Sequence, residues 1–127
     1  RASEMAAYDI NGDGPFVKNG ITIEWVYENF EQRGPDVHWR KQNRRGDRKM
    51  NKPAGVIGTG GHRRITSTGI HNRFIFAHHV AFALAHRRFP RYGMDAWHID
   101  GDPTNNCPSN LREVKRGTKL RAKVEPA

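Results

Sequence analysis

The sequence contains very little cysteine and no long apolar segment. Cys107 is the single cysteine, which excludes a disulfide framework within one chain and a cysteine-based zinc cluster. The apolar stretch at 74–84 is interrupted by His78 and His79, and it is shorter than the roughly 20 apolar residues of a membrane-spanning helix. The N-terminus has no apolar core of the kind found in secretory signals. We therefore expect no membrane segment and a reducing, cytoplasmic compartment.

Acidic residues are scarce relative to basic ones. The 127 residues include 22 Lys and Arg against 13 Asp and Glu, which gives a net charge of +9 with His neutral. A chain of this length is sufficient for one compact domain. Its excess of positive charge favours polyanions, because their binding releases condensed counterions. Nucleic acid is the leading partner, and an anionic membrane surface is the rival.

The N-terminal third predicts one helix and one strand. Residues 1–20 have little apolar periodicity and are expected to form an irregular arm. Thr22 can cap a helix that extends to about Gln32, in which apolar residues recur at helical spacing. The aromatic residues of this helix are expected in the core. A short strand is predicted at 37–40.

A basic segment at 40–52 follows this strand. Its seven positive side chains against Asp47 leave a net charge of +6. A stretch this polar is expected to be an exposed loop, and its charge favours contact with phosphates. The positive residues are Arg40, Lys41, Arg44, Arg45, Arg48, Lys49 and Lys52.

The middle of the chain changes to a strand pattern. Three β-prone runs at 56–57, 64–66 and 74–76 are separated by glycine-rich or polar turns. They predict a three-stranded antiparallel sheet, whose Arg63, Arg64 and Arg73 could also touch DNA. A helix is expected from about His78 to Arg88.

The last third has residues suited to phosphodiester cleavage. A predicted strand carries His98 into an Asp-Gly turn and a polar loop, and a helix is expected from about Leu111 to Val124. A hydrolytic nuclease needs a general base near water and a cation against the phosphate. A His at a strand end, facing a helix that supplies a metal ligand, meets both needs. An Asn in the intervening loop can bond the backbone and hold the His ring in place.

Four groups of residues occur in the order typical of one nuclease family. They are Trp39 with Ala54-Gly55, then Ile75-Phe76-Ala77-His78, then His98-Ile99-Asp100-Gly101-Asp102, and finally Asn105-Asn106 with Ser109-Asn110-Leu111-Arg112-Glu113-Val114. Over residues 30–123 the chain thereby resembles the phage and intron-encoded HNH endonucleases, which include small homing nucleases. The His-Ile-Asp-Gly-Asp and Asn-Leu-Arg segments at this spacing are the most specific part of the resemblance.

The resemblance implies roles for three residues. His98 would be the general base that activates water, Asn110 would shape the loop, and His78 would begin the helix beneath the site. The implied substrate is double-stranded DNA and the implied cofactor is a divalent cation, with Mg²⁺ expected. A phage-infected bacterial cell is the implied setting, and a host protein is a second candidate partner.

Two positions depart from the family pattern. Trp97 occupies the position before the His, where the family has an Asp or Asn metal ligand. Lys119 stands nine residues after Asn110, where the family has its second ligand. Neither can coordinate a cation, although Lys119 could place a fixed positive charge on the phosphate. The remaining candidate metal ligands are Asp95, Asp100 and Asp102.

The other polar residues have ordinary structural interpretations. Asp100 and Asp102 are expected to bond nearby backbone N–H groups of the turn. One of His78 and His79 is expected to cap the helix while the other meets solvent. The remaining histidines show no ligand spacing and are expected at the surface. They are His38, His62, His71 and His86.

Together these patterns predict a small α+β protein. We expect an arm at 1–20, a region at 21–77 with a helix, a basic loop and a three-stranded antiparallel sheet, and an HNH-type ββα module at 78–127. The favoured function is DNA cleavage with His98 as the base. The alternative is a relative that binds DNA or a host protein without cutting, and an RNA-binding module is a third possibility. Six C-terminal basic residues against Glu113 extend the expected DNA surface, among them Arg112, Lys115, Arg116, Lys119 and Arg121.

Overall fold

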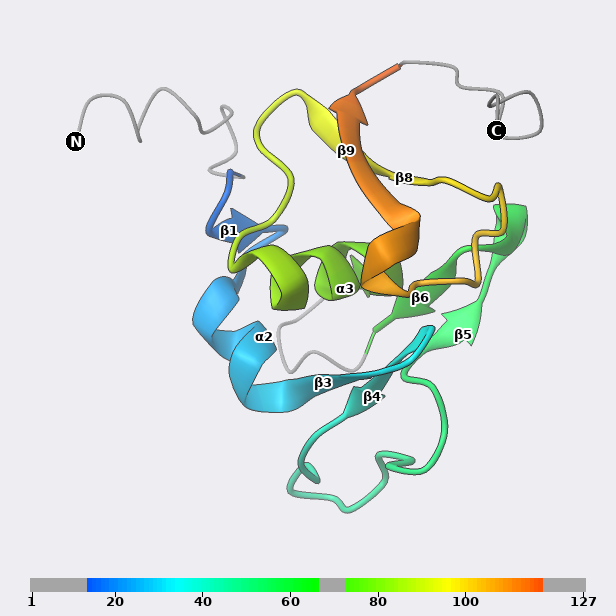
Figure 1. The fold of residues 1–127 in the computed structure, drawn as a ribbon. Coiled ribbons are helices and arrows are strands. Elements are labelled where there is room, and N and C mark those ends of the chain that lie inside the picture. Colours follow the sequence, from blue (N-terminus) through cyan, green and yellow to red (C-terminus); the bar gives the residue numbers. More distant parts are fainter. Residues whose placement is uncertain (1–13, 67–72, 118–127) are drawn as a thin grey trace.

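The protein folds around one central helix with small antiparallel sheets on its sides. The computed structural model describes residues 14–66 and 73–117. Figure 1 shows α3 (Ala77–His86) in the middle, with the β8–β9 hairpin on one side and α2 and the β3–β4 hairpin on the other. This arrangement confirms the predicted α+β class.

The central position of α3 follows from its composition. The helix is apolar around most of its circumference, since Val80, Ala81, Phe82 and Ala83 are all almost completely buried. It contacts α2, β3, β4, β6, β7 and β8. The prediction of a helix from His78 to Arg88 is confirmed within the usual uncertainty of helix ends. None of the helices in the described residues is long and apolar enough to span a membrane.

The segment that precedes the first described helix is paired. Strands β1 (Val17–Lys18) and β2 (Ile21–Thr22) form an antiparallel hairpin, and Phe89 N–H donates to Pro15 O at 2.6 Å. Residues 14–20 are therefore fixed against the end of α3, although an irregular arm was expected at 1–20. The remainder of that arm, residues 1–13, lies outside the described residues.

Helix α2 (Ile23–Asn29) begins where it was predicted and ends earlier. Thr22 accepts a hydrogen bond from Trp25 N–H at 3.2 Å and caps the helix. The predicted end near Gln32 is wrong, because Phe30–Arg33 forms strand β3 and pairs with β4 (Asp36–Trp39). The pairing stacks the rings of Phe30 and Trp39 at 4.5 Å, and this buried aromatic contact stabilises the hairpin.

The predicted three-stranded sheet is confirmed. Strands β5 (Val56–Ile57), β6 (Arg63–Ile65) and β7 (Ile75–Phe76) lie in that order, all antiparallel. The short 3-10 helix η1 (Thr59–Gly61) lies between the first two. Gly55 precedes this sheet with φ +87°, and a Cβ there would lie 2.4 Å from the Arg64 carbonyl oxygen. The Ala-Gly pair of the sequence pattern thus marks a place where only glycine fits.

The C-terminal hairpin differs from the prediction. Strand β8 (Met94–His98) pairs with β9 (Leu111–Lys115), and the 3-10 helix η2 (Pro108–Asn110) leads into β9. A helix was predicted from Leu111, and over 111–115 that prediction is wrong. The extended pairing turns Glu113 toward Arg88 and Arg91, whose guanidinium groups both bond its carboxylate. The rest of the predicted helix, from residue 118, lies outside the described residues.

Candidate active site

His98 occupies the end of β8, where the hairpin opens into the polar loop. It is buried, and its Nε2 lies 2.7 Å from Oδ1 of Asn106, which is also buried. An amide oxygen only accepts hydrogen bonds, so Nε2 carries the proton. The lone pair of the neutral ring then lies on Nδ1. Asn106 therefore fixes both the orientation and the tautomer of His98.

Asn110 organises the loop between β8 and β9. Its Oδ1 accepts a hydrogen bond from Asp100 N–H at 3.0 Å. Its Nδ2 donates to Asp100 Oδ1 and to the Asn105 carbonyl oxygen, each at 2.9 Å. These bonds connect both ends of the loop next to His98. The contact with the His98 ring comes from Asn106 and not from Asn110. The catalytic roles that the resemblance implies for His98, Asn110 and His78 stay predictions.

Two further histidines lie beside His98. His78 belongs to the first turn of α3 and is buried, and His62 lies between η1 and β6. The ring centroids are 4.9 Å apart for His62 and His78, 5.1 Å for His78 and His98, and 5.6 Å for His62 and His98. One potential ligand nitrogen from each ring lies within 4.8 Å of the others. We call these three residues the histidine triangle.

A histidine–carboxylate pair adjoins this triangle. His79 Nε2 lies 3.0 Å from Asp95 Oδ1, and Asp95 also accepts a hydrogen bond from Ala96 N–H. Together with His78, these two residues form a second group of possible ligands. The expectation that one of the two adjacent histidines caps α3 and the other meets solvent is wrong, since both are buried and the N-cap residue is Phe76.

The surroundings shift the pKa values of two imidazoles and of the neighbouring carboxyl group. Burial lowers the pKa of His62, and the neighbouring His98 lowers it further. Burial, together with the adjoining histidines, lowers the pKa of His78 to about 2. Burial would raise the pKa of Asp95, but the hydrogen bond and the charge of His79 hold it well below its usual range. The site therefore combines imidazole nitrogens with one carboxylate at its edge.

The histidine triangle lines a cleft of about 500 Å³. The β8–β9 hairpin contributes Trp97 and Lys115 to its wall, and the loop after β8 contributes Pro103. Lys115 was expected to touch DNA and brings positive charge to this cleft. Trp97, which stands directly before His98, is half-buried in the same wall.

Residues 76–120 match the family model of the HNH endonucleases. This part of the chain is similar to the HNH endonucleases. The match includes α3, β8 and β9, and so it contains His78, His98 and Asn110. The match covers 45 of the 127 residues and agrees with the resemblance seen in the sequence. Neither the curated proteins nor the solved structures contain a match to the chain.

The three carboxylates that the sequence offered as metal ligands are placed differently. Asp100 accepts from Asp102 N–H and from the side chains of Asn105 and Asn110. Asp102 accepts from the backbone and hydroxyl of Thr104. Both carboxylates therefore form the turn, as their ordinary interpretation predicted. Asp95 alone of the three lies with the histidines of the cleft.

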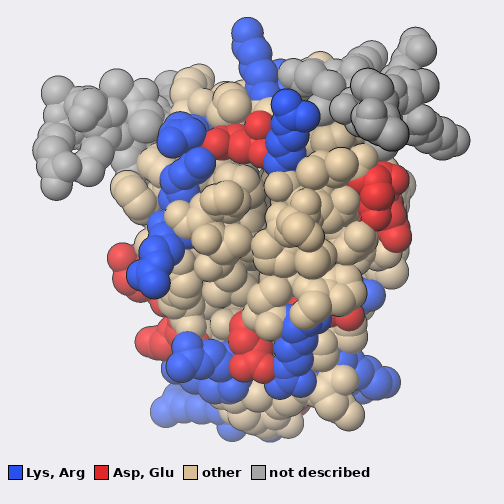
Figure 2. Space-filling view, in the orientation of Figure 1, with Lys and Arg blue, Asp and Glu red and all other residues tan. Residues whose placement is uncertain are grey.

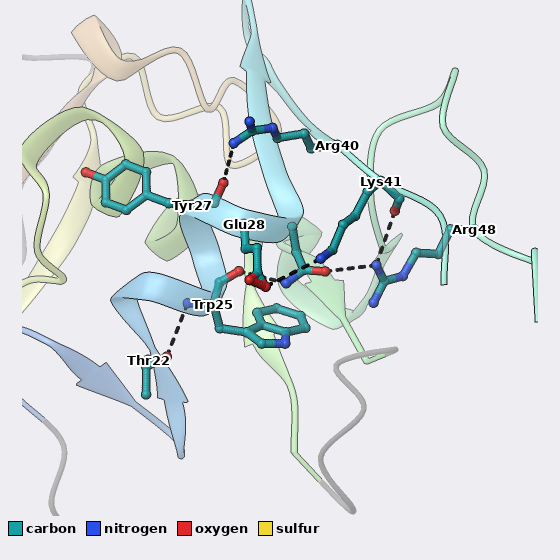
Figure 3. Close-up of polar contacts among 8 residues, drawn as sticks. Thr22, Trp25, Tyr27, Glu28, Arg40, Lys41 and Arg48 are labelled. Carbon is teal, nitrogen blue, oxygen red and sulfur yellow. Dashed lines mark hydrogen bonds and ion pairs between the residues drawn. The ribbon is translucent and has the colours of Figure 1, made fainter. Parts of the chain in front are cut away.

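The basic loop is exposed over most of its length, as predicted. Figure 2 shows Lys and Arg side chains gathered at the lower end of the molecule, where the chain between β4 and β5 lies in Figure 1. Figure 3 shows this loop reaching back to α2, with Arg40 donating to Tyr27 O and Lys41 paired with Glu28. Arg48 is partly buried, bonds Asn29 Oδ1 at 3.0 Å and stacks on Trp39 at 3.8 Å.

The predicted DNA contacts are therefore not equivalent. Arg44, Arg45, Lys49 and Lys52 are exposed in the loop, and Arg112, Lys115 and Arg116 are exposed on or beside β9. Arg48 mainly stabilises the fold, because its side chain bonds Asn29 and stacks on Trp39. Lys119 and Arg121 lie outside the described residues.

The sequence interpretation missed two site residues, His62 and Asn106. His62 was expected at the surface with no partner, although it completes the histidine triangle. Asn106 was regarded as a loop former, although it contacts the His98 ring. His38 was also expected at the surface, but it is buried with Nδ1 3.1 Å from Met50 O. His86 is exposed, as predicted, and His71 lies outside the described residues.

Proposed function

We propose that this HNH module hydrolyses phosphodiester bonds in double-stranded DNA, and that His98 is its central group. The observation that supports this function is the contact between His98 Nε2 and Asn106 Oδ1. This contact orients the imidazole and places the lone pair of its neutral form on Nδ1. When no cation holds that lone pair, it can accept the proton of an attacking water, which is the general-base role.

Positive charge around the cleft supports binding of a phosphate backbone. Lys115 lies in the cleft wall, and the exposed Arg44 and Arg45 lie in the basic loop. A second hollow between this loop and the three-stranded sheet is lined by Lys49, Lys52 and other basic residues. Such contacts bind DNA through its charge, independently of sequence. The cytoplasm is the proposed compartment.

The expected Mg²⁺ does not match the groups in the cleft. Mg²⁺ requires oxygen ligands in near-octahedral geometry, but Asp100 and Asp102 are bonded within their own turn. The cleft offers imidazoles, with only Asp95 as a carboxylate. A divalent cation in a nuclease supplies positive charge to the phosphate and lowers the pKa of water. In this cleft, a divalent cation would have to be bound mainly by imidazole nitrogens.

A second function is favoured by Trp97. This residue replaces the family's ligand beside the His and occupies the cleft wall. A protein that keeps the scaffold and the positive surface, without the cation site, would bind DNA and leave it intact. A host protein is the other partner that such a relative could engage.

Plasmid nicking separates the two functions. The protein would be incubated with supercoiled plasmid and Mg²⁺, Mn²⁺ or Zn²⁺, with and without chelator. We expect His98→Ala to reduce nicking at least about 100-fold, because a general base typically contributes 10²–10⁴. His86→Ala is the matched control, since His86 is exposed and outside the cleft lining. A salt-dependent gel shift without nicking under any condition would support the binding protein instead.

A further inference from the structure

The three rings of the histidine triangle are spaced as if around a common centre. Their centroids are 4.9, 5.1 and 5.6 Å apart. A tetrahedral ion bound at about 2.0–2.1 Å by three imidazole nitrogens holds the ring centres about 5 Å apart. The side chains therefore already have the separation of a three-histidine metal centre.

Three different elements supply these ligands. His78 is fixed in α3 and His98 at the end of β8, while His62 lies directly before β6. His98 also has the outer partner that metal-ligating histidines have, because Asn106 binds its other ring nitrogen. The ligand rings are thus held by packing and hydrogen bonds rather than by a single flexible loop.

One atom of the triangle lacks a partner. His62 Nδ1 is buried, and it has no hydrogen-bond partner within the part of the chain that the structure describes. A buried polar nitrogen without a partner costs free energy. The ring contacts of His62, with Phe76, His78 and His98, supply no hydrogen bond to this nitrogen, whereas coordination of a cation would offset the cost.

We propose that His62, His78 and His98 bind one divalent transition-metal ion of the Zn²⁺ class. Imidazole nitrogens suit Zn²⁺, Ni²⁺, Co²⁺ or Cu²⁺, whereas Mg²⁺ requires oxygen ligands. The cleft of about 500 Å³ leaves space for a water or phosphate oxygen at a fourth position, as in zinc sites that remain open to substrate. In the loaded protein the lone pair of His98 is a ligand and no longer the base.

A competing ligand set is His78, His79 and Asp95. In that set, however, His79 and Asp95 are already bonded to each other at 3.0 Å. Both groups share His78, so a variant of His78 cannot separate them. Variants of His62 and Asp95 can, because each of these residues belongs to only one group.

The test measures metal binding directly and without DNA. Metal-free protein would be titrated with Zn²⁺ in competition with a chromophoric chelator, and with Co²⁺ while its visible absorption is recorded. We expect one equivalent to bind and the Co²⁺ spectrum to show the intense bands of four-coordinate geometry. His62→Phe, which keeps a ring in place, should weaken binding at least about 100-fold, while Asp95→Asn and His86→Ala should change it less than about threefold. Circular dichroism would verify that each variant is folded.

Three results would overturn the proposal. The first is an absence of Zn²⁺ and Co²⁺ binding by the unaltered protein. The second is unchanged affinity in folded His62→Phe. The third is loss of binding in Asp95→Asn with retention in His62→Phe, which would assign the ion to the competing set. Affinity is measured without DNA, so the two proposals can fail separately. Intact Zn²⁺ binding by a protein that nicks plasmid neither with Mg²⁺, Mn²⁺ or Zn²⁺ nor with chelator would contradict the proposed nuclease function and leave the metal site standing.

Discussion

Asn106 accepts a hydrogen bond of 2.7 Å from Nε2 of His98, and both side chains are buried. The backbone of Asn106 is fixed in turn by the β3–β4 hairpin, because its N–H donates to Pro35 O and its carbonyl oxygen accepts from Gln32 Nε2. The β3–β4 hairpin thus positions, through Asn106, the histidine at the end of β8.

Substitution of Asn106 should affect His98 more than the fold. We expect Asn106→Leu to reduce plasmid nicking and Zn²⁺ affinity about 10–100-fold, as the loss of an outer partner of a ligating histidine typically does. Asn106→Asp keeps an acceptor for the Nε2 proton of His98 and should retain most of the nicking activity and most of the Zn²⁺ affinity. Asn105→Ala is the control, since its side chain bonds Asp100 and Cys107 rather than His98. Equal losses in Asn106→Asp and Asn106→Leu would argue against a positioning role.

The carboxylate of Glu113 should make stability depend on acid pH. Burial would raise its pKa, but hydrogen bonds from Arg88 and from Arg91 N–H, and the charges of both residues, lower it below its ordinary value of 4.5. Its contribution is therefore complete above about pH 4.5 and is lost as the pH falls through the lowered pKa. At neutral pH, Glu113→Gln should cost about 1–3 kcal/mol, the scale of hydrogen bonds to charged groups.

Urea denaturation of the unaltered protein and of Glu113→Gln between pH 7 and pH 3 would measure this effect. The gap in unfolding free energy between them should narrow as the pH falls. The matched control is Glu24→Gln at the exposed start of α2, which should change stability by less than about 0.5 kcal/mol. A gap for Glu113→Gln that stays constant over this range would contradict the assignment.

Residues of the basic loop should differ in how they affect DNA binding. The double variant Arg44→Ala/Arg45→Ala removes two exposed charges and should lower the slope of log affinity against log salt by about 1.8, at about 0.9 per phosphate contact. Arg48→Ala removes a side chain that bonds Asn29 and stacks on Trp39, and it should mainly lower the melting temperature. Gel shifts at several salt concentrations and thermal melts would separate the two effects. An unchanged slope in the double variant would exclude these arginines from the DNA surface.

Local patterns in the sequence predicted the parts of the fold that depend on local physics. The cap at Thr22, the apolar α3, the three short strands and the glycine turn between β5 and β6 are all present. Errors arose where distant pairing overrode helical periodicity. Phe30–Arg33 continues the apolar spacing of a helix, but the turn at Gly34 allows it to pair with β4. Leu111 likewise begins a strand because β8 lies opposite it.

The site was only partly predictable for a related reason. His98 and Asn110 lie in a contiguous motif, so the resemblance identified them. His62 lies outside any such motif and 36 positions before His98 in the sequence, and only the fold brings it to the cleft. Asn106 stands in a run of polar loop residues, where nothing in the sequence distinguishes it from Asn105. Contacts between distant segments cannot be read from residue spacing alone.

The spacing of the three histidines along the chain has a consequence for stability. Residues 62, 78 and 98 belong to a loop before β6, to the central helix and to the C-terminal hairpin, so one bound ion would cross-link three parts of a small core. Binding that requires the folded arrangement raises unfolding free energy by about 2.7 kcal/mol when the free ion exceeds its Kd 100-fold. The melting temperature of the protein would then vary with the availability of the metal, and cellular metal supply would help to determine how much of the folded protein persists.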